Sequence, residues 1–197
     1  MVLRVRTPLT IAALGLVVGL AGDACHVASG TTRYEPSWVP TVWESKLWFP
    51  LLIAGSVLLA ADAGRRARLP ALRARDRTDA LAGAAVVLAL YALTAVLRGQ
   101  PETVSVVLTA AVAAAVWAWW DPSRGALAIA ALAAVLGPAA EIALVEVGAA
   151  EYAADSDGLA GVAPWLPCLY FAAGAVASGL WEAVAVTGLT DRAPRDR

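Results

Sequence analysis

Residues 124–147, RGALAIAALAAVLGPAAEIALVEV, form an almost unbroken apolar run. A helix that crosses the hydrocarbon core of a membrane needs about 20 such residues, because each backbone amide must find its partner within the helix. The 197-residue chain as a whole is 60% hydrophobic and 16% charged, more apolar than one small soluble core requires. The run therefore predicts an integral membrane protein.

Similar runs recur along the rest of the chain. The candidate spans are residues 7–28, 44–63, 78–97, 102–120, 124–147 and 163–187. The first follows Arg4 and Arg6 as a signal peptide would, but it lacks a small-residue cleavage site, so we interpret it as a retained span. The loops are short, which favours antiparallel neighbours. We expect one all-α domain over residues 1–197, a bundle of six transmembrane helices.

Arginine is distributed unevenly between alternate loops. It is concentrated before the first span, in the loop 65–77 and after residue 191, whereas the opposite loops hold Arg33, Lys46 and Arg98. Because Lys and Arg gather on the cytoplasmic side, both termini should face the cytoplasm.

Three ionisable residues of the apolar spans are expected to share one layer of the bundle. Asp23 and His26 share one face of the first span, and Glu141 follows Gly137 and Pro138 in the fifth, at a similar depth. Proline inside a helix removes a hydrogen bond, so we expect a kink there and a cavity beside it. Such groups usually face the bundle interior or water. They predict the polar end of an apolar pocket for a lipid hydroxyl or ester; the alternative is that they are hydrated at the outer interface.

Evidence for catalysis is sparse. The chain has one histidine, no metal-ligand cluster and no phosphate-binding loop. We therefore assign no catalytic residues, metal, cofactor or nucleic-acid partner. The alternative is a small membrane enzyme or transporter that acts on an apolar or isoprenoid substrate through Asp23, His26 and Glu141. Cys25 and Cys168 fit no redox or zinc spacing, and a disulfide between them remains open.

Small residues recur at helical spacing, as in Gly15 with Gly19 and Gly174 with Ser178. Such faces let helix backbones approach closely in a membrane. We expect them to support helix packing and a homo-oligomer.

Three segments carry a resemblance: WAWWDPSRG at 117–125, SKLWFP at 45–50 and PWLPCLYFAAG at 164–174. In combination and order they resemble the Insig (insulin-induced gene) family. The resemblance implies a non-enzymatic, sterol-responsive regulator of the endoplasmic reticulum that binds an oxysterol and partners Scap or HMG-CoA reductase. Asp121, Ser123 and Arg124 match the family's partner-binding turn, in which Pro122 replaces the usual basic residue.

The bias toward Arg, Ala and Gly is typical of a high-GC, actinobacterial-type homologue, which would normally lack Scap and sterol synthesis. We therefore expect a non-catalytic protein of the bacterial plasma membrane (of the endoplasmic reticulum if eukaryotic) that holds a sterol-like or neutral lipid such as diacylglycerol. The residues predicted to bind this lipid are Glu141, Asp23, His26, Trp48, Pro138, Trp165 and Tyr170.

Overall fold

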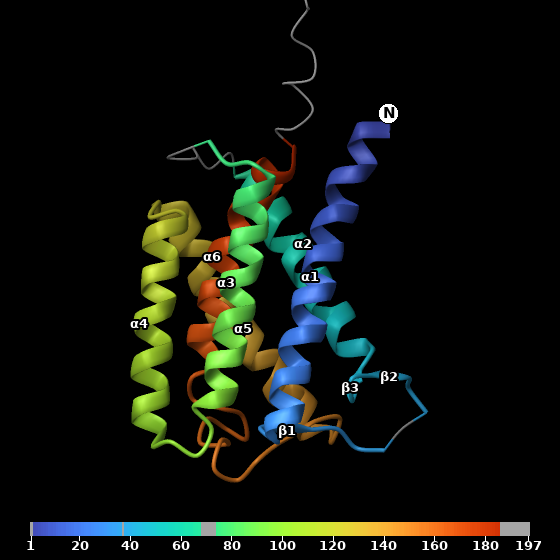
Figure 1. The fold of residues 1–197 in the computed structure, drawn as a ribbon, viewed down its shortest axis with the longest axis vertical. Helices are drawn as coiled ribbons and strands as arrows, with labels where there is room; N and C mark the ends of the chain where they lie inside the picture. Colours follow the sequence, from blue (N-terminus) through green and yellow to red (C-terminus); the bar gives the residue numbers. More distant parts are fainter. Residues whose placement is uncertain (1, 37, 68–73, 186–197) are drawn as a thin grey trace, which may run out of the picture.

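A computed structural model describes residues 2–36, 38–67 and 74–185. Its helices are α1 (Val2–Ser29), α2 (Trp48–Arg66), α3 (Arg77–Val96), α4 (Glu102–Trp120), α5 (Arg124–Glu146) and α6 (Leu166–Ala185), shown in Figure 1. All six are long and apolar enough to cross a membrane. The predicted all-α bundle of six transmembrane helices is confirmed.

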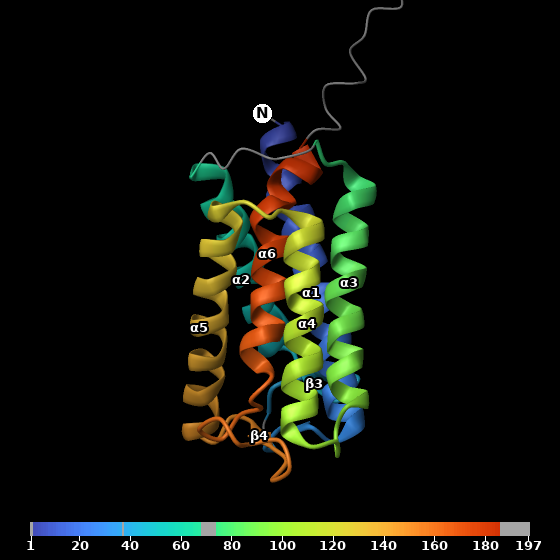
Figure 2. The ribbon, with the colours of Figure 1, turned by 90° about the vertical axis from the view of Figure 1, so that its left-hand side faces the viewer.

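Helix α6 is the centre of the bundle. It packs against each of the other five helices, and Figure 2 shows it between α5 on one side and α4 on the other. Of its most apolar 18 residues, 61% are buried inside the protein, against 17% for α5. Helix α5 thus presents most of its surface outward, whereas α6 supplies core residues such as Leu166, Leu169 and Leu180.

The two ends of the bundle differ. Helix α1 begins and α6 ends at one end, here called the N-terminal end (Figure 1). The opposite end, the strand end, carries two antiparallel strand pairs: β1 (Thr32–Arg33) with β4 (Glu151–Tyr152), and β2 (Thr41–Val42) with β3 (Ser45–Lys46). The pairing of β1 with β4 joins the segment between α1 and α2 to the loop between α5 and α6. The cytoplasmic orientation of the N-terminal end remains a prediction.

Local chemistry explains where several helices begin. Helix α2 starts at Trp48 rather than near residue 44, because Ser45 and Lys46 pair with β2 around a turn. Helix α5 starts after Ser123, whose Oγ accepts a hydrogen bond from the backbone N–H of Ala126 at 3.1 Å, a typical N-cap. From there α5 continues to Glu146 without interruption at Pro138.

Small residues bring helices of this one chain together. A Cβ added to Gly19 would lie 2.9 Å from Cβ of Ile53 on α2, and one added to Gly174 would lie 2.6 Å from Cβ of Ala133 on α5. These faces, which we expected to support an oligomer as well, are therefore covered within the chain by neighbouring helices. An oligomer must use other surfaces.

Candidate functional site

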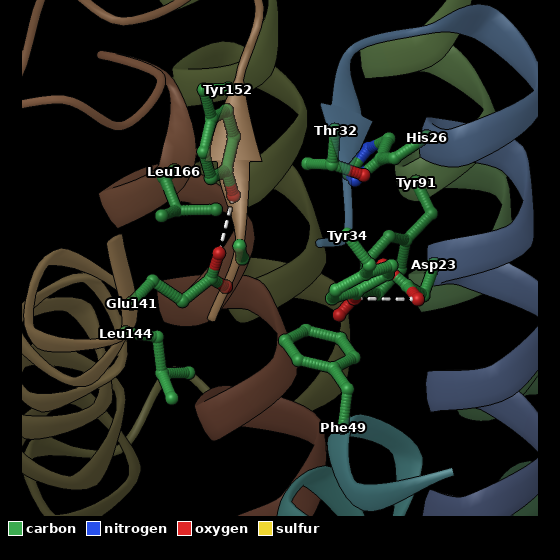
Figure 3. Close-up of a pocket in the computed structure, with 11 residues that line it drawn as sticks. Asp23, His26, Thr32, Tyr34, Phe49, Tyr91, Glu141, Leu144, Tyr152 and Leu166 are labelled. Atoms are coloured by element: carbon green, nitrogen blue, oxygen red, sulfur yellow. Dashed lines mark hydrogen bonds between the residues drawn. The ribbon is translucent and has the colours of Figure 1, made fainter. Parts of the chain in front are cut away.

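A polar pocket lies at the strand end between α1 and α5 (Figure 3). Its lining residues are Asp23, His26, Thr32, Tyr34, Phe49, Tyr91, Glu141, Leu144, Ala150, Tyr152 and Leu166. Figure 3 shows Asp23 and Glu141 on opposite sides of it. Its free volume is about 10 Å³, roughly what one water molecule requires.

Asp23 is held by a residue from outside the helices. Its side chain is buried, and its Oδ2 accepts a hydrogen bond from the phenol of Tyr34 at 2.8 Å. The Tyr34 ring lies edge-on to Trp48, with ring centroids 5.7 Å apart. Burial, and secondarily the charge of Asp23, raise the pKa of Tyr34 well above its usual value. Tyr34 therefore keeps its proton and remains a donor.

Both carboxylate oxygens of Glu141 accept hydrogen bonds from tyrosines. Tyr170 on α6 donates to Oε1 at 2.6 Å, and Tyr152 on β4 donates to Oε2. Burial, followed by the charge of Glu141, raises the pKa of Tyr152 well above its usual value, so this phenol also stays protonated. A buried carboxylate requires such partners because its desolvation is otherwise costly.

The position of Tyr170 depends on Gly137. A Cβ at residue 137 would lie 2.3 Å from the Tyr170 ring. The space beside the Gly137–Pro138 pair, where we expected the cavity, is thus filled by this ring. The pocket lies farther along α5, where Glu141 and Leu144 line it.

His26 is engaged with a neighbouring helix. Its Nε2 lies 2.8 Å from the hydroxyl oxygen of Thr94 on α3. The same hydroxyl oxygen lies 2.9 Å from the backbone carbonyl oxygen of Tyr91. The Thr94 hydroxyl has one hydrogen and gives it to that carbonyl, so we infer that Nε2–H of His26 donates to Thr94. The rings of Tyr91 and Trp165 pack on the imidazole, both with centroids 5.1 Å away.

Thr32 contributes a hydroxyl that has no partner. It is buried and lines the pocket, yet its Oγ1 makes no hydrogen bond within the described part of the chain. Buried polar atoms are nearly always satisfied in native proteins. This hydroxyl is therefore available to a molecule in the pocket.

The structure brings the residues that we predicted for lipid binding to one end of the bundle. Asp23, His26 and Glu141 line the pocket directly. The others support them: Tyr170 bonds Glu141, Trp165 packs on His26, Trp48 packs on Tyr34, and Pro138 is buried one turn before Glu141.

Sequence reasoning missed the residues that come from loops and short strands. Tyr34 and Tyr152 each lie 11 residues from the carboxylate that they contact, beyond the end of its helix. Thr32 pairs with Tyr152 across the two-residue strands β1 and β4. Strands this short leave no periodic pattern in the sequence, and the available signal was a tyrosine in each of the two loops at this end of the bundle.

The predicted partner-binding turn lies at the opposite, N-terminal end. Asp121 is buried there, and its Oδ2 lies 3.2 Å from a guanidinium nitrogen of Arg75, which also donates to the carbonyl oxygen of Trp120 at 2.5 Å. Ser123 caps α5, and Arg124 is exposed. The Asp121 carboxylate is thus directed into the protein, toward the buried Arg75.

Cys25 and Cys168 are free thiols in this structure. Within the described residues, no group of three or more His, Cys, Asp and Glu side chains is arranged to hold a metal ion.

Comparisons with known proteins agree on one group of relatives. No protein-family model matches the chain. A curated relative, the INSIG protein homolog of Mycolicibacterium vanbaalenii, is 43% identical over 181 residues, which are 91% of this chain and 87% of the relative. The crystal structure of the mycobacterial Insig homolog MvINS from Mycobacterium vanbaalenii is similar at a TM-score of 0.86 and 39% identity, covering 100% of both chains. A cross-linked MvINS R77C trimer is similar at the same TM-score and 40% identity, again over 100% of both chains.

Proposed function

The chain belongs to the Insig family, and from this premise we propose that it is a non-catalytic membrane protein that holds one neutral lipid in the strand-end pocket. The favoured ligand class is a lipid with a free hydroxyl beside an ester or ring, such as a diacylglycerol or a sterol-like molecule. The similarity to mycobacterial relatives supports a bacterial plasma membrane. The uneven distribution of arginine between alternate loops supports both termini in the cytoplasm.

The unpartnered hydroxyl of Thr32 carries this proposal. It is a buried polar atom in the wall of a pocket, so a ligand oxygen or hydroxyl there would satisfy it. The carboxylate of Asp23 lines the same pocket and has acceptor capacity beyond the bond from Tyr34. A lipid hydroxyl can donate to Asp23 and accept from Thr32.

The charge of the pocket favours a neutral headgroup. Two carboxylic side chains line it, and none of the lining residues in the described part of the chain is Lys or Arg. A phosphate in this space would approach two carboxylates without a counter-charge, and its desolvation would cost several kcal/mol or more. A phospholipid head is therefore disfavoured relative to a hydroxyl.

An apolar groove nearer the middle of the bundle, partly open to the outside, supports the same ligand class. It is lined by Leu14, Gly15, Val18, Val57, Ala84, Val87, Ala173, Val176, Ala177 and Leu180, and its free volume is about 30 Å³. Gly15 lies eight residues before Asp23 on α1, roughly 12 Å along the helix axis. One lipid can place its head at Asp23 and a tail toward Gly15. Both spaces are small, so the helices must separate when the ligand enters.

The hydrogen bonds of the pocket support binding over catalysis. The alternative, an enzyme or transporter for an apolar or isoprenoid substrate, would use Asp23, His26 and Glu141 as proton carriers. Both oxygens of Glu141 already accept from phenols, and Nε2 of His26 is bonded to Thr94. A proton carrier needs an atom free to exchange a proton with its substrate. Of these three residues Asp23 keeps such an oxygen, which the proposal assigns to the lipid hydroxyl, and a relay through all three is disfavoured.

A homo-oligomer is part of the proposal. A related protein has been crystallised as a cross-linked trimer, and α5 here leaves Leu132, Val135 and Leu136 exposed. We do not propose a Scap-like or HMG-CoA reductase-like partner, because Asp121 is engaged by Arg75 within the chain.

Native mass spectrometry of the purified protein tests the lipid proposal. We expect one lipid of a single class per chain, retained less well by Thr32→Val and Asp23→Asn. Thr32→Ser keeps the hydroxyl and should retain the lipid. Glu146→Gln changes an exposed glutamate on the same helix as Glu141 and serves as a control. Recovery of bulk phospholipid alone, with no difference between the variants, would contradict the proposal.

A further inference from the structure

A short hairpin at the strand end carries exposed tryptophans that neither the pocket nor the bundle uses. We call residues 38–46 the tryptophan hairpin; it contains β2 and β3. The Trp38 side chain is 93% exposed and that of Trp43 is 68% exposed. Two exposed indoles on one short segment are unusual for a surface in contact with water alone.

The tryptophan hairpin lies beside the bundle. In Figure 1, β2 and β3 lie next to the beginning of α2, level with the last turns of α1, whereas β1 lies nearer the end of the bundle. The hairpin leads directly into α2 at Trp48, and the first two turns of that helix expose Leu51 and Leu52. The hairpin is therefore continuous with the outward, apolar surface of a membrane-spanning helix.

The base of the hairpin is buried and hydrogen-bonded, whereas its tip is exposed. Ser45 and Lys46 are buried, and the backbone N–H of Leu47 donates to the carbonyl oxygen of Pro40 at 3.1 Å. At the tip, Trp43 and Glu44 adopt φ angles of 49° and 66°. Positive φ at both central residues is the geometry of a two-residue hairpin turn that glycine and asparagine usually occupy. The chain holds a tryptophan in this turn although its backbone conformation disfavours one.

We propose that the tryptophan hairpin is a membrane anchor that lies in the lipid headgroup region at the strand end. Indole rings favour this region because they have an apolar body and one N–H donor. In this placement Trp43 and Trp38 contact lipid, and the neighbouring exposed Glu44 lies at the same headgroup depth. The partner is the bilayer interface, because the hairpin extends the lipid-facing surface of α2.

The depth of the hairpin in a bilayer is measurable with a spin label. The protein, with Cys25→Ala and Cys168→Ala, is labelled at Glu44→Cys and reconstituted into phosphatidylcholine vesicles. Asp157→Cys, in the exposed part of the α5–α6 loop, serves as the matched reference. We expect the label at residue 44 to show a several-fold higher ratio of oxygen to nickel-chelate accessibility than the reference. Adding Trp38→Ser and Trp43→Ser should lower this ratio to that of the reference.

Two results would overturn the proposal. Equal ratios at residues 44 and 157 in the tryptophan-bearing protein would place the hairpin in water. Low accessibility of residue 44 to both reagents would instead place the hairpin against another protein surface, such as a second copy of this chain. If the serine variant does not fold, the comparison within the tryptophan-bearing protein still decides, and it does not depend on whether the strand-end pocket binds lipid.

Discussion

Tyr170 on α6 donates a hydrogen bond to Oε1 of Glu141 on α5 at 2.6 Å. Its ring lies where a side chain at residue 137 would stand, one turn before Glu141. The contact between α5 and the central helix at Gly137 thus also sets the orientation of the pocket carboxylate. This relationship links the packing of the bundle to its candidate site.

Gly137→Ala should destabilise the protein. Its Cβ would lie 2.3 Å from the Tyr170 ring, so the ring must move, and overpacking of this kind costs about 1–3 kcal/mol. Gly55→Ala on α2 is the matched control, because a Cβ there meets no atom within 4 Å. Gly55→Ala should leave the free energy of unfolding unchanged, or raise it by about 0.5–1 kcal/mol because alanine favours the helix more than glycine does. Thermal unfolding in detergent compares the stability of the two variants. Equal effects of the two substitutions would show that the contact of Gly137 with the Tyr170 ring does not contribute to stability.

Tyr170→Phe removes a donor from Glu141 while keeping the ring. A hydrogen bond to a carboxylate contributes about 1.5–3 kcal/mol, so we expect a loss of this size in the free energy of unfolding. In a Glu141→Gln background the same change should cost less, because the acceptor is no longer a carboxylate. A double-mutant cycle measures this difference. A coupling energy near zero would mean that the bond contributes no net stability.

The apolar runs predicted the six helices, and the conspicuous charges within them predicted part of the site. Asp23, His26 and Glu141 stand out because an ionisable residue in an apolar span is costly unless it faces the interior. The residues that satisfy them were less visible. Thr32 and Tyr152 are brought to the pocket by a long-range pairing between two-residue strands, and such a pairing has no local sequence signal.

Arg75 shows a different limit of sequence reasoning. It lies among the arginines of loop 65–77, which we interpreted as determinants of orientation. The structure buries this one side chain against Trp120, with the guanidinium carbon 5.0 Å from the ring centroid. Its neighbour Arg77 is exposed. Charge patterning treats the two alike, and only the tertiary packing distinguishes them.

Stability should fall in alkaline solution. Burial raises the pKa of Tyr34 and Tyr152 in the folded protein well above the ordinary value of 10.0, whereas in the unfolded chain they ionise near that value. Their contribution is therefore fully present below about pH 10 and is lost as the pH rises further. We expect the melting temperature to fall between about pH 10 and pH 11.5 while the phenols remain protonated in the folded state. Tyrosinate absorbance followed during thermal melts checks this, and ionisation of both residues before unfolding would contradict it.

Breaking the buried pair of Arg75 and Asp121 should be the most damaging change at the N-terminal end. Asp121→Ala removes the nearer carboxylate of the buried Arg75 guanidinium, 3.2 Å away, and leaves the half-exposed Glu182 carboxylate at 3.8 Å. Loss of a buried partner typically costs about 3–5 kcal/mol, and because Glu182 remains we expect the lower end of this range. Arg75→Met leaves the carboxylate unpaired and should cost a similar amount. Arg77→Met, at an exposed position two residues away, should change stability by no more than about 0.5 kcal/mol.

The double variant, Arg75→Met with Asp121→Ala, distinguishes a structural pair from two independent residues. Because it leaves neither charge buried alone, its loss of stability should be clearly smaller than the sum of the two single losses, as measured by unfolding in detergent. Additive losses would mean that each side chain acts separately, Arg75 through the Trp120 carbonyl and Asp121 through the backbone N–H of Ser123. In that case the carboxylate of Asp121 would not depend on Arg75, and a partner at this end of the bundle could engage it directly.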